Sequence, residues 1–402
     1  MLSFSRTIFI AIIALVLSPN VNATNPNPLS TEQKVADFDS LYFQLKGAFP
    51  YFEVNKRLNQ VDWLGNYEAY KTRISQTQNN KQYLAEIDAI MDELNCGHAD
   101  LLPTVYYNYM FTRYRMISWT HKSYKRHLQE LKKNDAKQKN QYWAHIYQEL
   151  HPSKKSKKTT ENTEATANLT FEIFEAQSLA VMHIKSFSYE HVKADKKALL
   201  KFYENLNNYE NLIIDIQGNG GGDTRYWQQN IVPYISNTTL NYSSYTAFKD
   251  NAEFYNFAGQ LEGMPIDSVP LYNMPEELYE DDYLFKKSSW SLHPNKKSIH
   301  YRGKIYVLAD HNVYSSSEAF ANFCINTGFA KVVGETTGGD GVGSDPFLFT
   351  LPHSGIVIRY PGIMGLNADG SSNEEIGTIP SIEIEGNTCE ERFTNFIKTI
   401  DG

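Results

Sequence analysis

Apolar side chains in the first hundred residues recur at the spacing of an α-helix. Between Thr31 and Lys46 they stand three or four residues apart, and Thr31 is suited to cap the start of a helix. The same spacing recurs between Lys81 and Leu94. These segments predict a small N-terminal helical region over residues 24–105, which ends in the segment that carries His98.

The next part of the chain is polar. Residues 106–150 are rich in Tyr, Trp, Lys and His and are expected to be helical, whereas residues 151–168 hold almost no apolar side chain and predict a solvated linker. We therefore treat residues 106–168 as a connecting region. The lysine cluster at residues 154–158 is interpreted as part of the solvated loop, although it could touch an anionic surface.

From residue 169 onward, short apolar runs alternate with helical segments. The runs predict buried strands at residues 179–184, 211–216, 304–308 and 331–334, with helices at 193–207 and 317–327. This alternation predicts an α/β domain over residues 169–390 whose buried strands are parallel. Residues 242–298, aromatic and punctuated by prolines, interrupt the alternation and are expected to be an insertion that overhangs the site.

Composition excludes several classes of protein. The chain has 402 residues, of which 41% are hydrophobic and 21% charged, and its net charge of -8 gives no basic field for nucleic acid. Three cysteines, Cys96, Cys324 and Cys389, permit at most one internal disulfide, so this is not a disulfide scaffold. No HExxH or comparable ligand set occurs, and we predict neither a metal nor another cofactor.

The N-terminus has the pattern of a secretory signal peptide. Arg6 precedes an apolar run over residues 7–17, and a small-residue cleavage site follows at residues 21–23. The run is too short to span a bilayer comfortably. We expect residues 1–23 to be removed, the mature protein to begin near Thr24 in the periplasm or outside the cell, and no stable membrane insertion to remain.

A run of three serines marks the first candidate for chemistry. Ser315, Ser316 and Ser317 stand where a predicted strand passes through a short turn into a helix. A hydroxyl at such a turn lies beside backbone N–H groups that the helix has not used, which is the setting a serine nucleophile requires. The same run could instead be only a helix cap.

Two further segments offer the groups that would assist a nucleophile. The glycines from Gly218 to Gly222 follow a buried strand, and their amides could point at a developing oxyanion, or the segment could be a plain turn. His98 follows a glycine after a helix, and histidine is suited to take a hydroxyl proton near neutral pH. Cys96 lies two residues before it, without the surroundings of a nucleophile.

The order of these segments, followed by GETTGG and by the EEIGTIP element, resembles the tricorn and C-terminal-processing (tail-specific) serine peptidases. That family is built on the ClpP/crotonase-like fold, and the resemblance covers about residues 170–385, with a looser match around His98. It implies a catalytic domain of that fold preceded by the helical region. The site residues that it implies are Ser315 as nucleophile, His98 as base, Glu374 as orienting acid with Glu375 as the alternative, and the amide of Ser316 with that of Gly221 or Gly220 as oxyanion hole.

This sequence also departs from the family pattern. Asp340 stands where the C-terminal-processing branch has its catalytic lysine, and an aspartate cannot act as that neutral amine. The resemblance therefore favours the tricorn-like branch with a Ser–His–Glu site, and Asp340 receives no catalytic role. In the tricorn-like branch a serine often stands directly before the histidine, whereas Gly97 occupies that position here. No PDZ pattern is recognisable between His98 and residue 169.

The function expected from this reading is an exported serine peptidase that cleaves a peptide or unfolded-protein substrate through an acyl-enzyme. Two alternatives stay open. One is an esterase or amidase with the same triad. The other is a binding protein for lipophilic ligands on the same fold, with the aromatic insertion lining its pocket. The sequence does not predict the number of subunits.

Overall fold

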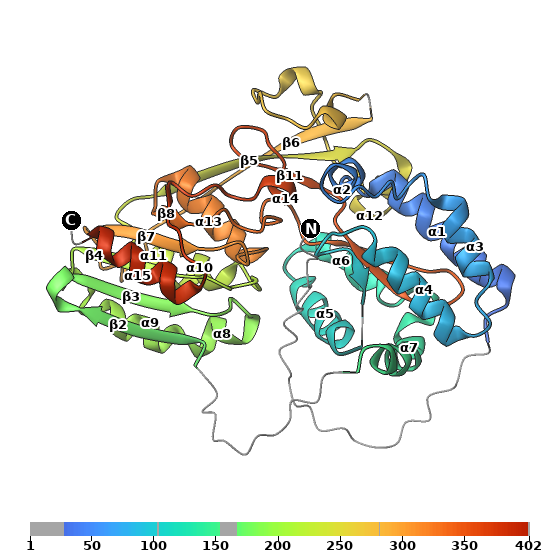
Figure 1. The fold of residues 1–402 in the computed structure, drawn as a ribbon, viewed down its shortest axis with the longest axis horizontal. Helices are drawn as coiled ribbons and strands as arrows, with labels where there is room; N and C mark the ends of the chain where they lie inside the picture. The colour runs from blue at the N-terminus through green and yellow to red at the C-terminus, as the bar shows by residue number, and fades with distance from the viewer. Residues whose placement is uncertain (1–27, 103, 153–166, 281, 401–402) are drawn as a thin grey trace, which may run out of the picture.

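The computed structural model describes residues 28–102, 104–152, 167–280 and 282–400. The predicted signal segment 1–23 and the lysine cluster 154–158 lie outside these residues. Figure 1 shows a helical part and a strand-rich part side by side, with two long strands running across the top from one to the other. Within the described residues, no helix has the length and apolar character needed to cross a membrane.

The predicted N-terminal helices are present and bury their apolar faces. The helices of this segment are α1 (Thr31–Ala48), α2 (Phe52–Asn59), α3 (Tyr67–Ser75) and α4 (Asn80–Asp92). The cap of α1 is Ser30 rather than Thr31: the Ser30 hydroxyl accepts from the Gln33 amide at 3.3 Å, and the Gln33 side chain accepts from the Ser30 amide at 3.0 Å. This reciprocal pair satisfies two amides that the first turn leaves free.

Three more helices complete the helical part, as predicted for residues 106–150. They are α5 (Thr104–Ile117), α6 (Lys125–Glu130) and α7 (Ala136–Leu150). They pack with a small antiparallel sheet of strands β1 (Asp100–Leu101), β10 (Val357–Tyr360) and β9 (Phe347–Thr350). Residues 347–360, which the sequence pattern assigned to the C-terminal domain, therefore contribute to the core of the helical part.

The strand-rich part contains a six-stranded sheet. Its order is β12 (Ile382–Glu383), β8 (Lys331–Gly334), β7 (Lys304–Ala309), β4 (Asn211–Asp215), β3 (Leu179–Ile184) and β2 (Leu169–Phe174). Neighbours from β12 to β3 pair in parallel, and only β2 is antiparallel to its neighbour. The four strands predicted from apolar runs are all here, because helices cover both sheet faces and leave no position for alternating polar residues.

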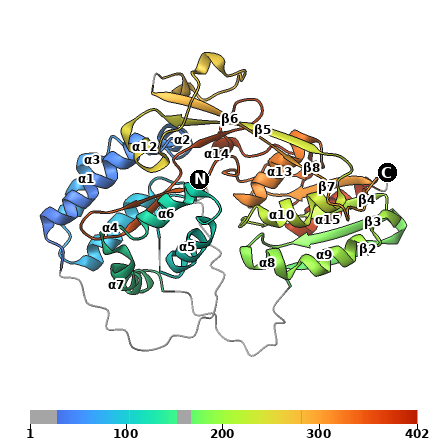
Figure 2. The ribbon, with the colours of Figure 1, turned by 180° about the vertical axis from the view of Figure 1, so that it is seen from behind.

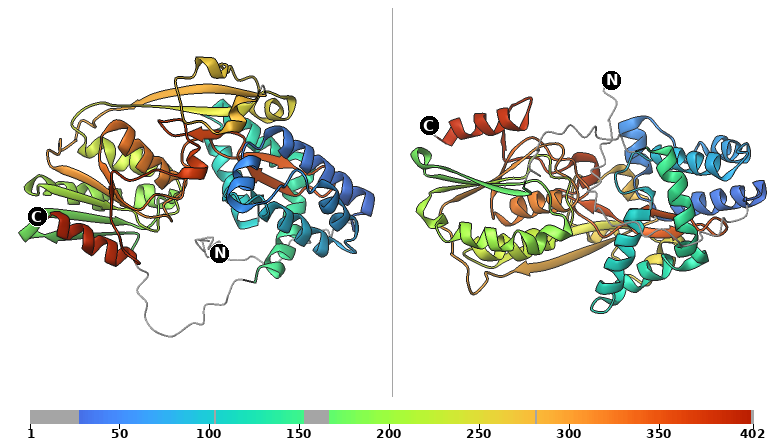
Figure 3. Two further views of the ribbon diagram at one scale, coloured as in Figure 1. Left: turned by 45° about the horizontal axis from the view of Figure 1, so that its top comes forward. Right: turned by 90° about the horizontal axis from the view of Figure 1, so that it is seen from below.

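Helices on the two faces form two separate apolar clusters. One face is covered by α8 (Tyr189–Ala194), α9 (Lys196–Tyr203), α10 (Arg225–Asn230), α11 (Val232–Ile235) and α13 (Ser316–Thr327), and the other by α15 (Cys389–Ile400). The right panel of Figure 3 shows α15 on the opposite side of the sheet from α8 and α9. The predicted helix 193–207 is broken at Asp195, whose carboxylate accepts hydrogen bonds from Asn168 and Tyr226. The fold is thus the α/β class expected from the sequence.

The segment 242–298, predicted as an insertion, begins and ends in two long paired strands. Strands β5 (Leu240–Lys249) and β6 (Tyr283–Leu292) pair over their whole length, and β11 (Met364–Leu366) adds to the other edge of β5. Between them α12 (Ala252–Ala258) packs on α1. Figure 2 shows these strands running from the sheet with its helices to the helical part. We call residues 240–292, which include β5 and β6, the bridging arm. This arm connects the helical part and the strand-rich part, and the candidate site lies between these parts.

Candidate active site

Ser315 occupies a strained turn between β7 and α13. Its backbone angles are φ 57° and ψ -120°, a combination that residues other than glycine rarely adopt. Two hydrogen bonds hold it: the Ser315 amide donates to the Gly339 carbonyl at 3.2 Å, and the Ala319 amide donates to the Ser315 carbonyl at 2.8 Å. Such strain costs about 1–3 kcal/mol and persists where the surroundings impose it, often at functional sites.

The three serines differ in their surroundings. Ser317 is fully buried, and its hydroxyl donates to the Tyr314 carbonyl at 2.8 Å. Ser316 is 4% exposed, and its hydroxyl has no hydrogen-bond partner among the described residues. Ser315 is partly exposed, and its side chain does not cap the helix. Of the three, Ser315 alone is not buried.

The glycine loop after β4 lies against this turn. Gly221 has φ 101°, and a Cβ placed on it would lie 2.6 Å from the Tyr314 carbonyl oxygen and 2.8 Å from the Ser316 nitrogen. Only glycine fits so close an approach at that φ. The Gly221 amide donates to the Asn219 side chain at 3.0 Å, whereas the amides of Gly220 and Ser316 find no acceptor among the described residues. Gly220 and Ser316 therefore offer the free donors of this turn.

His98 reaches the turn from the helical part. It lies between α4 and β1, and Asp100 of β1 is fixed by a two-bond ion pair with Arg359, at 3.0 and 2.7 Å. The His98 ring packs beside the Tyr314 ring with centroids 5.3 Å apart. His98 Nδ1 is in hydrogen-bond contact with the Asp340 carboxylate. The structure thus brings His98 next to the residue that precedes Ser315, without a hydrogen bond between His98 and the Ser315 hydroxyl.

A second carboxyl group lies behind Asp340. Glu374 belongs to the short helix α14 (Asn373–Ile376), and the Tyr314 hydroxyl donates to Asp340 at 2.8 Å and lies 3.4 Å from a Glu374 oxygen. A carboxylate oxygen of Asp340 lies within 4.8 Å of one of Glu374. Burial, and then the charge of Asp340, raise the pKa of Glu374 well above its usual range. The protonated form of Glu374 is therefore favoured where it lies beside Asp340.

The structure places the predicted acids differently from the resemblance. Asp340, rather than Glu374, is the carboxylate in contact with His98, and Glu374 contacts Asp340 and Tyr314. Glu375 points elsewhere, into an ion pair with Arg57 at 2.7 Å. Sequence reasoning missed Asp340 because it read that position only as a missing lysine.

Tyr314 explains the glycine before the histidine. A Cβ on Gly97 would lie 2.6 Å from the Tyr314 hydroxyl oxygen, so the phenol fills the space that a serine at position 97 would need. The same hydroxyl contacts both carboxyl groups. Burial raises the pKa of Tyr314 well above its usual range, so the phenol stays a hydrogen-bond donor. The sequence signal for this role was the pairing of a glycine at 97 with a tyrosine before the serine run.

Glu318 fixes the helix of the nucleophile to α14. Its fully buried carboxyl group accepts from the Thr378 hydroxyl at 2.5 Å and from the Asn373 amide at 2.7 Å. Asn373 also accepts from the Gly341 amide at 2.9 Å, which ties the Asp340 loop to the same helix. The positions of Ser315, Asp340 and Glu374 are therefore set by one polar network.

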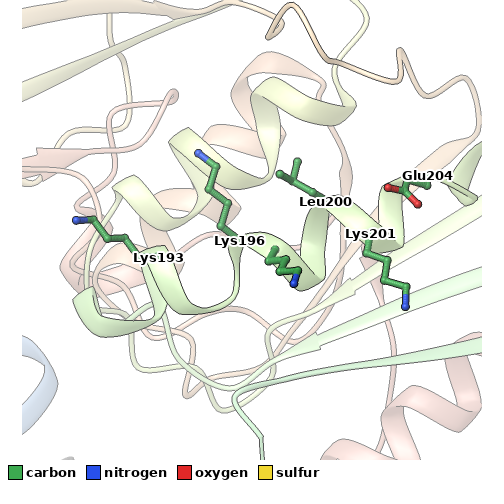
Figure 4. Close-up of a pocket in the computed structure, with 6 residues that line it drawn as sticks. Lys193, Lys196, Leu200, Lys201 and Glu204 are labelled. Atoms are coloured by element: carbon green, nitrogen blue, oxygen red, sulfur yellow. The ribbon is translucent and has the colours of Figure 1, made fainter.

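A groove lined by lysines lies apart from this site. It has a volume of about 570 Å³ on α8 and α9 and is lined by Lys193, Lys196, Lys197, Leu200, Lys201 and Glu204 (Figure 4). None of its side chains is a hydroxyl, thiol or imidazole that could act as nucleophile or base, and it includes none of the predicted site residues. The chemistry therefore concentrates at the Ser315 turn.

Comparison with known proteins bears on the family and the fold of this chain. The model of peptidase family S41 matches residues 178–384. A crystal structure described as a "putative peptidase" from Parabacteroides merdae ATCC 43184 is similar over 93% of this chain and 98% of its own, with a TM-score of 0.57 and 16% identity. Mature CPAF complexed with lactacystin is similar over 92% of this chain and 97% of its own, with a TM-score of 0.55 and 12% identity. At these identities the structures show a shared fold. A search of curated proteins found no match.

Proposed function

The chain belongs to peptidase family S41 and is a serine-type peptidase, and from that premise we propose that Ser315 is its nucleophile and His98 its general base. The observation that carries the proposal is the strained, partly exposed turn of Ser315 at the start of α13, with His98 packed against the adjacent Tyr314. Ser315 attacks a peptide carbonyl, an acyl-enzyme forms, and water then releases the acyl group.

Asp340 orients the base in this proposal. With His98 neutral, a proton on Nδ1 is donated to the Asp340 carboxylate, and the lone pair on Nε2 is left to accept the Ser315 proton. The raised pKa of Glu374 favours its protonated form, which can donate to Asp340 and hold that side chain in place. The Ser315–His98–Glu374 triad implied by the resemblance thus becomes a chain in which Asp340 stands between His98 and Glu374.

The oxyanion hole is assigned to the amides of Ser316 and Gly220. Ser316 is the first residue of α13, where the helix has not used its N–H groups. Gly220 is favoured over Gly221, because the Gly221 amide is already donated to Asn219. Backbone donors fixed in this way stabilise the developing negative charge of the tetrahedral intermediate.

The expected substrate is a peptide or an unfolded protein, in keeping with the peptidase family. The signal-like pattern of residues 1–23 supports export, and we propose that the enzyme works in the periplasm or outside the cell. Family membership and the Ser315–His98 pair favour peptide cleavage over the alternative in which the fold only binds a lipophilic ligand.

Labelling with a fluorophosphonate tests the nucleophile. The purified mature protein should form one adduct, on the peptide that contains Ser315, and Ser315→Ala should abolish it. Ser316→Ala is the matched control, because its buried hydroxyl has no role in the proposal and its labelling rate should stay within a few-fold of the parent. An adduct on Ser316 or Ser317, or persistent labelling of Ser315→Ala, contradicts the assignment.

A further inference from the structure

Cys96 is a thiol beside the site that the proposed mechanism does not use. It is 3% exposed and lies two residues before His98. Its sulfur lies within 4.8 Å of carboxylate oxygens of both Asp340 and Glu374, and those oxygens are equally close to each other. A thiol and two carboxyl groups from three separate segments therefore converge on one point.

Positively charged partners are few around Cys96, Asp340 and Glu374. Among the described residues, the ion-pair partner of Asp340 is His98, and Glu374 pairs with no lysine or arginine. Nearby acids in the same region have basic partners: Glu375 and Glu277 both pair with Arg57, and Asp100 pairs with Arg359. Two half-buried carboxyl groups whose oxygens lie within 4.8 Å repel each other when both are ionised, and a divalent cation between them would remove that repulsion.

We propose that Cys96, Asp340 and Glu374 form an inhibitory zinc site, with Cys96 Sγ and one oxygen of each carboxylate as ligands and His98 Nδ1 or water as the fourth. A thiolate with carboxylates and an imidazole suits zinc rather than magnesium or calcium, which take oxygen ligands. Ligand atoms in a tetrahedral zinc site stand roughly 3.5 Å apart, so side-chain shifts of about 1 Å suffice. As the ion binds, the thiol and Glu374 protons pass to solvent.

Zinc bound at this site would prevent His98 from acting as the general base. The ion takes the Asp340 oxygen that contacts His98 Nδ1, or takes Nδ1 itself, and either event removes the carboxylate that orients the imidazole. The Tyr314 hydroxyl can remain as a donor to the ligating carboxylates from outside the metal shell. The ion can enter from the His98 side, where the side chains of His98 and Asp340 are 18% and 11% exposed. The inhibition, but not the binding, rests on the proposed function.

Cobalt binding tests the site without reference to activity. Co²⁺ is titrated into the mature protein carrying Cys389→Ser, which removes the exposed thiol. We expect a thiolate-to-cobalt absorption band that added Zn²⁺ displaces. Cys96→Ser should abolish the band, whereas Cys324→Ser, which removes a fully buried thiol in the core of the sheet, should retain it. If Cys96→Ser does not fold, Glu374→Gln replaces it, with the cobalt affinity falling at least tenfold.

Inhibition is measured on the same proteins. Zn²⁺ should slow fluorophosphonate labelling of Ser315, EDTA should restore it, and Cys96→Ser should need at least tenfold more Zn²⁺ for the same fractional loss. A missing thiolate band in protein that still labels at Ser315 overturns the zinc site and leaves the proposed function standing. A band that depends on Cys96 in protein whose Ser315 does not label supports the zinc site and counts against the proposed function. Equal zinc sensitivity in Cys96→Ser overturns the inhibitory mechanism.

Discussion

Replacing Asp340 by asparagine should inactivate the enzyme more severely than replacing Glu374 by glutamine. Asp340 contacts His98 Nδ1 directly, whereas Glu374 reaches the imidazole only through Asp340. An asparagine at 340 can donate its amide N–H to Nδ1, which forces the imidazole proton onto Nε2. His98 would then have no lone pair with which to accept the Ser315 proton.

The expected magnitudes follow from these contacts. Loss of the carboxylate that orients a catalytic histidine lowers turnover by about 10⁴-fold, roughly 5 kcal/mol of transition-state stabilisation. Asp340→Asn should approach that loss. The raised pKa of Glu374 favours the protonated form, which can donate to Asp340, and a glutamine amide can donate the same hydrogen bond. We therefore expect Glu374→Gln to keep turnover within about tenfold of the parent.

The assay is turnover of a fluorogenic peptide, with fluorophosphonate labelling as a measure of acylation alone. Thermal unfolding of each variant shows whether the fold is retained. Sequence alone led to the opposite order, in which Glu374→Gln causes the large loss and Asp340→Asn leaves most activity. That order, found in folded proteins, would refute the assignment of Asp340 and restore Glu374 as the acid that acts on His98.

Other predictions concern the backbone of the site, its surroundings and export. Gly221→Ala should slow labelling of Ser315 by about 10²-fold or more, because the added methyl would lie 2.6 Å from the Tyr314 carbonyl oxygen beside the oxyanion donors; unchanged labelling would contradict this. Gly97→Ser should lower turnover by displacing the Tyr314 hydroxyl, and activity equal to the parent would show that the contact is dispensable. Burial lowers the pKa of His127 to about 4. As the pH falls below about 6.5, His127 becomes protonated in the unfolded chain but stays neutral in the folded protein, so the free energy of unfolding drops by about 1.4 kcal/mol per pH unit. Urea unfolding at pH 7 and pH 5 should show a smaller drop for His127→Gln than for the parent. N-terminal sequencing of the exported protein should begin near Thr24, and an intact N-terminus would contradict cleavage.

Strands with continuous apolar runs could be predicted from the sequence because their signal is local. The run at residues 179–184 is β3, and the run at 331–334 is β8. The pairing of β1 with β10 could not be predicted, since it joins residues 259 apart whose side chains carry no local sign of the partner. The same limit applies to Asp340, which meets His98 across 242 positions of the chain. A resemblance compares positions along the chain, and it cannot show which of two carboxyl groups a histidine touches.

The proposed nucleophile and base are held by different hydrophobic cores. Their relative position therefore depends on the contacts between the helical part and the strand-rich part. The segment of His98 packs in the core of the helical part, whereas Val313 and Phe320 flank Ser315 in the core of the sheet. Near the site, Arg57 of α2 connects the helical part to α14 by pairing with Glu375 at 2.7 Å, and it also pairs with Glu277, between β5 and β6, at 2.8 Å. A displacement of about 1 Å between reacting groups can cost 10²-fold in rate. The bridging arm and the Arg57 pairs therefore belong to the catalytic geometry, although none of them touches Ser315 or His98.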